Sequence, residues 1–313
     1  MPAISGFVNF NPDKDIPSLQ GRVIFVTGGT AGLGRASVKA LAKHDPTHIY
    51  FTGRNEQAGE ALIEEIKKAN PSVEMSFLKM DMTSLSSVKK ACAQFTHDRL
   101  DILMCNAGIM DKPPDLSEDG FEIHFAVNHL AHGMIIQQVL PVLRRTADLP
   151  GSDVRVVVLT SAGWRGHPKN GIDFATIRTK QEDLTLLGFN LRYGQSKIAN
   201  IIYAAEIARR YPKIKAVSIH PGVVTTDLVN SLPLMRKAFV YGANWMLGGG
   251  VVDESIGRLN QLWAAAGAKR DELVNGAYYK PVGVQGKLDK IAVSEELGHE
   301  LWSWTDEMLA KVA

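Results

Sequence analysis

The sequence is poor in cysteine. Its 313 residues include two, Cys92 and Cys105, and their spacing matches no zinc-binding pattern. Two isolated cysteines also cannot build the disulfide framework of a small secreted protein. We therefore expect two buried, reduced thiols in a protein of the cytoplasm.

Long hydrophobic runs are absent as well. No stretch reaches the roughly 18 uninterrupted apolar residues of a membrane-spanning helix. The nearest candidate, AFVYGANWMLGGGVV from Ala238, is shorter and contains four glycines. We interpret it as a buried helix or a flexible flap, with contact to a membrane surface as the alternative. The first 20 residues lack a basic stretch followed by an apolar core, so we expect no secretory signal.

Neither sign of charge is in excess. The chain has 35 basic and 33 acidic residues, a net charge of +2 at pH 7. The basic residues form no stripe, so we expect no nucleic-acid partner. His124, His129 and His132 have no further ligand at a matching spacing, so we expect structural histidines and no metal site.

What the sequence does contain is a regular alternation of strand and helix patterns. Short runs rich in Val, Ile and Leu predict strands buried on both faces, as in a parallel sheet. They begin at Arg22, His48, Glu74, Leu100, Val154 and Ile214, with a weaker one at Gly276. Helical patterns lie near 33–44, 55–69, 83–97, 118–146, 191–211, 253–267 and 294–311. This order predicts a single doubly wound (Rossmann) α/β domain over residues 1–313, with a mostly parallel seven-stranded sheet flanked by helices.

Two segments interrupt the alternation. Residues 162–192 form a connection too long for a plain strand-to-helix loop. Residues 228–250 include the apolar side chains Leu228, Leu232, Leu234, Met235, Phe239, Tyr241 and Trp245. We expect both segments to be flaps on the substrate side, and the apolar residues favour a hydrophobic substrate.

A glycine-rich turn follows the first strand, in VIFVTGGTAGLGRAS. Gly28, Gly29, Gly32 and Gly34 allow a pyrophosphate to approach the backbone, and the helix that starts there offers free N–H groups and its positive dipole end. The second strand ends in IYFTGRN, where a site for NAD places a carboxylate. Arg54 stands there instead and can pair with a 2′-phosphate, which favours NADP (NADPH) over NAD.

A possible proton donor lies farther along the chain. Tyr193 and Lys197 are four residues apart and share one face of a helix. An ammonium near a phenol stabilises the phenolate and lowers the pKa of the phenol. We therefore expect Tyr193 to act as a general acid or base. Ser161 ends the VVVLTS strand, at the sheet edge where ligands of open α/β folds bind.

In combination, these motifs resemble those of the short-chain dehydrogenase/reductase family. TGGTAGLG matches its glycine motif, which implies nucleotide contacts by Gly28, Thr30, Gly32, Leu33 and Gly34. DM (Asp81 and Met82) corresponds to the adenine site, and CNAG supplies Asn106, Ala107 and Gly108, with Cys105 in place of an asparagine. HPGVVTTDL resembles the segment that holds the nicotinamide carboxamide, through Val224 and Thr226. The match covers residues 22 to about 230.

The resemblance also implies roles for four side chains. Tyr193 would exchange a proton with the substrate oxygen, and Ser161 would position that oxygen. Lys197 would lower the pKa of Tyr193 and, like Tyr193, contact the nicotinamide ribose. Asn128, in VNHLAH, would hold a water that links Lys197 to solvent.

Two features narrow the resemblance to the retinol-dehydrogenase-like and protochlorophyllide-reductase-like branch. They are the VNHLAH and YGQSKIAN motifs and the 32-residue separation of Ser161 from Tyr193. The implied reaction is reversible, NADPH-dependent reduction of a ketone or aldehyde of a hydrophobic small molecule. The family often dimerises through its fourth and fifth helices, but this branch includes monomers, so both a homodimer and a monomer stay open.

Other functions on an α/β scaffold were weighed. The same fold could bind NADP without net redox chemistry, as a lyase, an isomerase or a regulatory binding protein. A Ser-His-Asp hydrolase would need a Gly-x-Ser-x-Gly elbow. The closest stretch, GQSKI around Ser196, lacks the second glycine and falls within a predicted helix.

Overall fold

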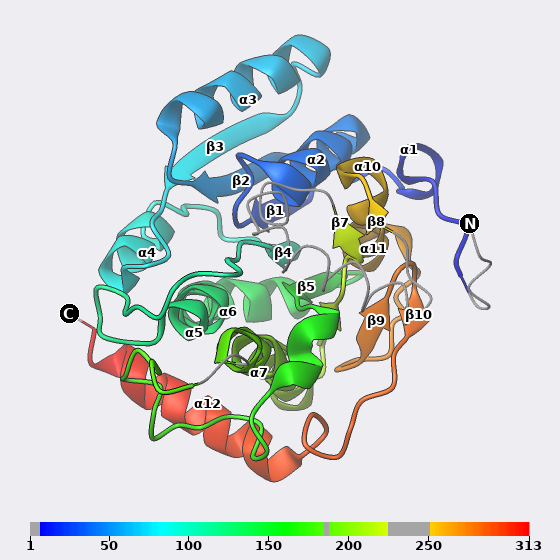
Figure 1. Cartoon of the computed structure of the whole chain (residues 1–313). Helices are drawn as coiled ribbons and strands as arrows, with labels where there is room; N and C mark the ends of the chain where they lie inside the picture. Colours follow the sequence, from blue (N-terminus) through cyan, green and yellow to red (C-terminus); the bar gives the residue numbers. More distant parts are fainter. Residues whose placement is uncertain (1–6, 185–187, 225–250, 313) are drawn as a thin grey trace.

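The strands form one twisted sheet in a computed structural model that describes residues 7–184, 188–224 and 251–312 (Figure 1). The sheet order is β10-β9-β6-β5-β4-β1-β2-β3. The strands are β1 (Val23–Val26), β2 (His48–Gly53), β3 (Glu74–Lys79), β4 (Ile102–Cys105), β5 (Val154–Leu159), β6 (Ile214–Ile219), β9 (Tyr278–Lys280) and β10 (Val284–Gln285). Seven of them are parallel, which confirms the predicted Rossmann architecture.

The eighth strand was not predicted. β10 pairs antiparallel with β9 at the edge of the sheet. It is two residues long and therefore too short to show a hydrophobic pattern. Gly283, in the turn between the two strands, has a φ of +69°, a value that glycine adopts without strain.

Helices cover both faces of the sheet. The longer ones are α2 (Gly32–Leu41), α3 (Glu56–Ala69), α4 (Leu85–Cys92), α6 (Ala131–Ala147), α7 (Gly188–Arg210) and α12 (Glu295–Ala310). Shorter elements are α1 (Pro12–Asp15), η1 (Ala42–His44), α5 (Ile123–Phe125), η2 (Ala126–Leu130), η3 (Ala162–Gly166), β7 (Val223–Val224), β8 (Val251–Val252), α10 (Glu254–Gly257), α11 (Leu259–Leu262) and η4 (Trp263–Gly267). None of the described helices is long and apolar enough to cross a membrane.

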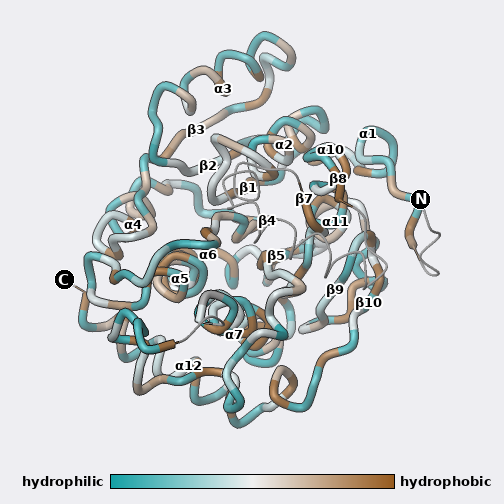
Figure 2. Tube along the Cα trace, in the orientation of Figure 1, coloured by the Kyte–Doolittle hydropathy of each residue, from teal (hydrophilic) through white to brown (hydrophobic). Residues whose placement is uncertain are grey.

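Alternate residues of each strand enter opposite halves of the core. In β1, Phe25 packs with buried residues of α4, α6, α7 and α12. Its neighbours Ile24 and Val26 pack instead with buried residues of α2, α3 and α11. This two-sided burial explains the nearly continuous hydrophobic strands of the sequence. The helices mix hydrophobic and hydrophilic residues along their length, as one-sided burial requires (Figure 2).

Two predicted helices are interrupted. The pattern near 118–146 divides into α5, the π-helical turn η2 and α6. The N–H of Ala131 bonds to the carbonyl of Ala126, five residues back, which marks the π register. The pattern near 253–267 divides in the same way into α10, α11 and the π turn η4. Hydrophobic spacing alone does not distinguish a π turn from an α-helix, because both keep one face buried.

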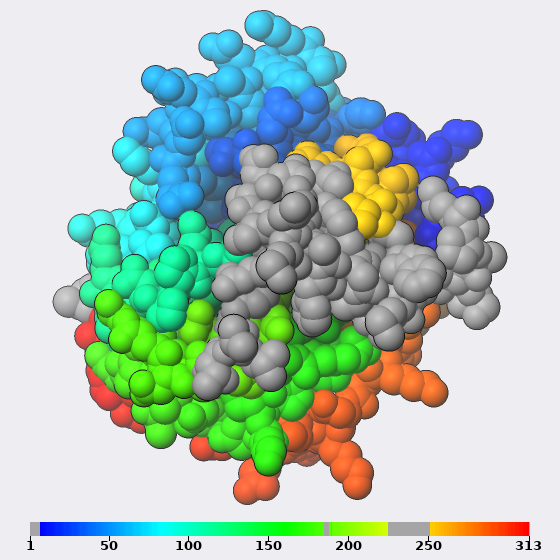
Figure 3. Space-filling view, viewed as in Figure 1, coloured from blue at the N-terminus to red at the C-terminus, as the bar shows by residue number. Residues whose placement is uncertain are grey.

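The chain changes direction at the centre of the sheet. From β1 it moves outward to β2 and β3, and then returns to place β4 on the other side of β1. The loops after β1 and β4 therefore lie side by side at the carboxyl ends of the strands. Doubly wound folds bind ligands at this position. In Figure 3 the elements from β1 to α4 (blue and cyan) form one end of the molecule, and α7, α12 and the C-terminal loops form the other.

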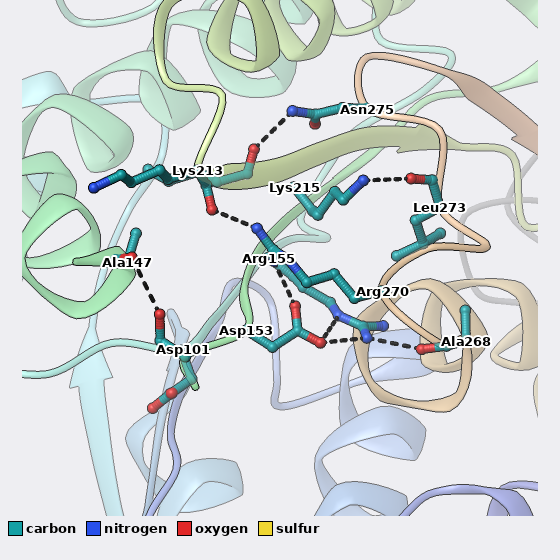
Figure 4. A network of polar contacts seen from close by, with 12 residues as sticks. Asp101, Ala147, Asp153, Arg155, Lys213, Lys215, Ala268, Arg270, Leu273 and Asn275 are labelled. Carbon is teal, nitrogen blue, oxygen red and sulfur yellow. Dashed lines mark hydrogen bonds and ion pairs between the residues drawn. The ribbon is translucent and has the colours of Figure 1, made fainter. Parts of the chain in front are cut away.

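Charged residues form a network at the opposite end of the sheet, where the parallel strands begin (Figure 4). Asp101 is fully buried and accepts hydrogen bonds from Arg22, Arg99 and the N–H of Val23 at 2.8–3.0 Å. Arg155 bonds to Asp153 and to the carbonyls of Ala264 and Ala268. These contacts tie β1, β4 and β5 to the segment around 264–270, far from the ligand edge.

We predict that Asp101→Asn destabilises the protein by about 3 kcal/mol, because two arginines and a backbone N–H lose their shared carboxylate. Urea unfolding monitored by circular dichroism measures the change. Asp148→Asn is the control, since Asp148 pairs with Lys213 in an exposed contact and should leave the unfolding midpoint in place. Equal midpoints for the two variants would show that the buried network adds no stability.

Candidate active site

The loop between β1 and α2 is shaped for a phosphate. Gly28 and Gly32 have φ values of +66° and +51°, in the left-handed region. A Cβ on Gly34 would overlap the carbonyl oxygen of Gly28, so only glycine permits this close packing. Ala31, the N-cap of α2, gives no side-chain hydrogen bond to the first turn. The first-turn N–H groups of α2 therefore remain available to an anion.

Thr27 links this loop to the loop after β4. Its hydroxyl oxygen accepts hydrogen bonds from the N–H groups of Asn106 and Ala107 at 2.8 and 2.9 Å. The Asn106 amide in turn donates to the carbonyl of Thr27 at 2.8 Å. A Cβ on Gly28 would lie 3.1 Å from the Cα of Ala107. The predicted nucleotide residues after β1 and β4 thus form one surface.

Arg54 lies directly after β2, at the predicted ribose end. Its side chain is exposed and makes no hydrogen bond or ion pair with the part of the chain that the structure describes. Thr30 lies against this strand end, since a Cβ on Gly53 would come within 2.6 Å of the Thr30 methyl carbon. Asp81 accepts two hydrogen bonds from Thr83, and Met82 is buried beside it. The residues predicted for the adenosine end therefore follow the ends of two neighbouring strands, β2 and β3.

The predicted proton donor lies on α7. Tyr193 is 8% exposed, and Lys197 is 5% exposed one turn further on. The Lys197 Nζ lies 5.7 Å from the centroid of the Tyr193 ring and donates to the Leu159 carbonyl at 3.4 Å. Ser161 follows β5 and forms a hydrogen bond with Tyr193. The structure brings these three predicted residues together.

The nucleotide loop and these side chains are neighbours. A Cβ on Gly108 would lie 3.0 Å from Asn128 Oδ1 and 3.4 Å from Lys197 Nζ. A Cβ on Gly163 would lie 2.9 Å from a ring carbon of Tyr193. Glycine at both positions therefore leaves room between the backbone and the reactive side chains. The predicted cofactor surface thus lies beside Asn128 and Lys197, and the loop after β5 lies beside Tyr193.

Asn128 lies in the π turn η2 and is completely buried. Its amide oxygen accepts from the N–H of Ile109 at 2.8 Å, and its amide nitrogen donates to the Ile109 carbonyl and to Ser196. Ser196 donates in turn to the carbonyl of Tyr193 at 2.8 Å. Ser196 is thus a buried residue within a helix, and the geometry excludes it as the nucleophile of a hydrolase elbow.

The last predicted cofactor residues lie on the far side of the glycine loop. Val224 ends β7 and is buried, and a Cβ on Gly257 would touch both Val224 and Leu33. Leu33 and Val224 are therefore neighbours, as the resemblance implies. Thr226 and the predicted flap over 228–250 lie outside the described residues.

Comparison with known proteins decides the family. The family model for short chain dehydrogenases matches residues 22–165. A short-chain dehydrogenase/reductase of Aspergillus calidoustus, drtF, is 35% identical over 312 residues, covering 95% of this chain and 96% of that protein. The chain belongs to the short-chain dehydrogenase/reductase family. It is accordingly an oxidoreductase, and the nicotinamide dinucleotides are the cofactors typical of the family.

Other relatives agree with this assignment. The chloroplastic short-chain dehydrogenase TIC 32 A of Brassica napus is 32% identical over 209 residues, 65% of this chain and 64% of that protein. The structure of a Mycobacterium paratuberculosis protein superposes with a TM-score of 0.69 at 23% identity, covering 95% of this chain and 97% of that one. NADPH-bound carbonyl reductase from chicken fatty liver gives a TM-score of 0.61 at 21% identity, covering 85% and 99%. At these identities the two structures support the fold alone.

The pKa of Tyr193 differs from the expectation. Burial raises it to about 12, and the hydrogen bond with Ser161 offsets part of the rise. Burial also lowers the pKa of Lys197 to about 8. Desolvation therefore outweighs the expected effect of the ammonium on the phenol. A pKa of about 12 keeps the phenol of Tyr193 protonated at neutral pH.

The insert 162–192 is packed more firmly than a free flap. Trp164, Ile172 and Ile177 are buried in the core. The carbonyl of Ile177 accepts from the N–H of Glu122 at 2.7 Å, and the side chain of Gln195 accepts from the N–H of Asp173 at 2.7 Å. The described part of the insert is thus fixed to the helix that carries Tyr193.

A buried cluster of charged residues beside Tyr193 was not predicted from the sequence. Glu122 accepts from His124 Nδ1 at 2.7 Å and from the N–H of Phe125 at 2.8 Å, and the Arg192 Nε lies 3.7 Å from it. The rings of His124 and Tyr193 meet edge to face, with centroids 6.3 Å apart. The Glu-x-His spacing at 122–124 was the available signal. Arg192 comes from another helix, which spacing could not reveal.

The three histidines weighed as metal ligands have separate partners. His124 bonds to Glu122, His129 to Thr305, and His132 to Thr27. No group of three or more metal-binding side chains occurs among the residues that the structure describes. Each histidine is engaged in the packing between elements.

We predict that kcat/KM for reduction falls about tenfold per pH unit above pH 8, as Lys197 loses its proton while Tyr193 keeps its own. Initial rates between pH 6 and pH 10 measure the profile. Lys197→Arg should remove the break whatever its residual activity, because a guanidinium stays charged over this range. The exposed-face variant Lys67→Arg should retain the break at pH 8. A break at the same pH in Lys197→Arg would assign it to another group.

Proposed function

We propose that the chain is an NADPH-dependent carbonyl reductase that converts a ketone or aldehyde of a hydrophobic small molecule to an alcohol, reversibly. The observation that carries the proposal is the close approach of the Asn106–Gly108 loop to Lys197, which lies beside Tyr193. A Cβ on Gly108 would lie 3.4 Å from Lys197 Nζ, and Lys197 Nζ lies 5.7 Å from the centroid of the Tyr193 ring. The family fixes the reaction class, and the proposal adds the direction and the cofactor.

The side chains of this site support reduction. Ser161 holds the carbonyl oxygen by a hydrogen bond, in reach of the Tyr193 hydroxyl. NADPH supplies the hydride to the carbonyl carbon when it is bound. The oxygen, now an alkoxide, takes the phenol proton of Tyr193, and a phenolate remains.

Lys197 acts on that phenolate. Its ammonium lies near the ring in a buried setting, where a charge interaction is stronger than in water. The lysine therefore stabilises the product of proton transfer, although it does not lower the resting pKa of Tyr193. Asn128, whose amide binds Ile109 and Ser196, maintains the backbone around Lys197. The proposed water link from Lys197 to solvent would lie beside it.

Residues of the nucleotide surface fit the cofactor. Close backbone approach at Gly28 and Gly34 provides a cradle that any Cβ would fill. Arg54 follows β2 with its side chain exposed, and a guanidinium can pair with a 2′-phosphate. We propose NADPH over NADH for this reason. Two buried free thiols also suit a reducing compartment such as the cytoplasm.

Within the family, we propose a branch and an oligomeric state for this chain. The VNHLAH and YGQSKIAN motifs and the long insert support the retinol-dehydrogenase-like branch. α12 packs along α7, with Trp302 stacked on Tyr203 at 4.9 Å between centroids. Since α12 covers a helix through which family members dimerise, we propose a monomer.

The reaction is tested by NADPH oxidation at 340 nm against a panel of aliphatic, aromatic and polycyclic ketones. Turnover with a subset of the apolar ketones supports the proposal. Binding of NADPH without its oxidation, while a product still forms, would support a lyase or isomerase on the same scaffold.

We predict that Tyr193→Phe lowers kcat at least about 100-fold while the Kd for NADPH changes less than about threefold, because one proton donor is lost. Steady-state kinetics and fluorescence titration measure the two. Tyr203→Phe is the matched control on the same helix, since the Tyr203 hydroxyl has no hydrogen-bond partner in the described chain. Full activity of Tyr193→Phe would place the acid elsewhere.

We predict that Arg54→Asp raises the KM for NADPH more than about tenfold and leaves the KM for NADH unchanged or lower, because a carboxylate repels the 2′-phosphate. Arg145→Asp makes the same charge change at the far end of α6 and should affect neither cofactor. An equal rise for NADPH and NADH would mean that Arg54 does not meet the 2′-phosphate.

A further inference from the structure

A buried chain of hydrogen bonds runs from the glycine loop to the catalytic helix through His132. The His132 ring contacts the Thr27 hydroxyl with Nε2 and the Asn128 carbonyl with Nδ1, each at 2.9 Å. The side-chain amide nitrogen of Asn128 donates to the Ser196 hydroxyl at 2.9 Å. The Ser196 hydroxyl donates in turn to the backbone carbonyl of Tyr193 at 2.8 Å. The side chains of Thr27, Asn128, His132 and Ser196 are buried.

The partners fix the direction of every bond. The Asn128 carbonyl can only accept, so His132 Nδ1 carries a proton. Burial lowers the pKa of His132 to about 4, so the ring is neutral and its Nε2 accepts. The Thr27 hydroxyl therefore donates to His132, and its lone pairs accept the N–H groups of Asn106 and Ala107. The Met104 carbonyl also lies 3.4 Å from the Thr27 hydroxyl oxygen, and the shorter separation of 2.9 Å favours His132 as the acceptor.

The π turn contributes to this geometry. Ala131 bonds to Ala126 in the π register, immediately before His132. The ring of His132 then reaches the carbonyl of Asn128, four residues back and within the turn. Isolated π turns within helices frequently occur at functional sites. Here the turn positions His132 for both of its contacts, the one with Thr27 and the one with Asn128.

We propose that His132 is a positioning residue with two separable arms: its Nε2 arm sets the nucleotide loops through Thr27, and its Nδ1 arm sets Tyr193 through Asn128 and Ser196. This inference rests on the proposed function, because it assigns one arm to cofactor binding and the other to proton transfer. His132 touches neither reactant and acts through these neighbours.

Two substitutions separate the arms. In His132→Gln the amide oxygen reaches about the position of Nε2, so the bond to Thr27 is retained and the bond to Asn128 is lost. In His132→Asn the shorter amide reaches about the position of Nδ1, so the bond to Asn128 is retained and the bond to Thr27 is lost. We expect His132→Gln to lower kcat about tenfold with KM for NADPH within about threefold. We expect His132→Asn to raise that KM about tenfold with kcat within about threefold.

Thr27 provides an independent check on the Nε2 arm. Thr27→Val removes its hydroxyl and should raise the KM for NADPH at least as much as His132→Asn does, because it also removes the acceptor of the Asn106 and Ala107 N–H groups. The double variant should show no rise beyond that of Thr27→Val, because the bond that His132→Asn breaks is already absent. Thr27→Ser retains the hydroxyl and should restore the wild-type KM. If one His132 variant does not fold, the other still tests its own arm.

The outcomes that would overturn the inference are distinct from a failure of the proposed function. If both His132 variants lower kcat, raise KM and lower the thermal midpoint in equal proportion, His132 is a packing residue only. Additive effects of Thr27→Val and His132→Asn would also overturn it. If the wild type oxidises no NADPH with any ketone, the proposed function fails, and the Nε2 arm is then judged by fluorescence titration of NADPH alone.

Discussion

Burial of Tyr193 and Lys197 is the constraint on which the site depends. Removing both side chains from water moves their pKa values in opposite directions, to about 12 and about 8. The phenol therefore stays protonated at neutral pH, and the ammonium loses its proton just above neutral pH. In the proposed reaction, the phenolate of such a pair forms only as the substrate oxygen takes the proton. The Leu159 carbonyl accepts a hydrogen bond from the ammonium, and the glycines at 108 and 163 let the backbone approach Lys197 and Tyr193 closely.

Much of the fold could be predicted from the sequence. Runs such as VIFV and VRVVVL are buried on both sides, and that burial leaves an unmistakable hydrophobic pattern. β10 could not be predicted, because two residues carry no period. The π turns at 126–130 and 263–267 were also beyond reach, since one added residue in a turn changes the hydrogen-bond register without disturbing the buried face.

The site was predictable to the extent that its residues are neighbours in motifs. Tyr193 and Lys197 are one helical turn apart, and the glycines after β1 need no distant partner to be recognised. The sign of the Tyr193 pKa change was not predictable, because it depends on how completely the folded chain excludes water. The contacts of His132 and Glu122 could not be predicted for a related reason. Their partners, Thr27 and Arg192, come from other elements, and a single sequence contains no record of such contacts.

The charged network around Asp101 gives the molecule two unlike edges. At the edge where strands begin, carboxylates, guanidinium groups and carbonyls satisfy one another within the protein. At the opposite end of the strands, the N-cap of α2 gives no side-chain hydrogen bond to the first-turn amides, and the guanidinium of Arg54 bonds to nothing within residues 7–184, 188–224 and 251–312. The groups that hold the strands together and the groups of the candidate site therefore lie at opposite ends of the sheet. The loops at the candidate site can diverge in evolution, from one substrate to another, without weakening the network that stabilises the sheet.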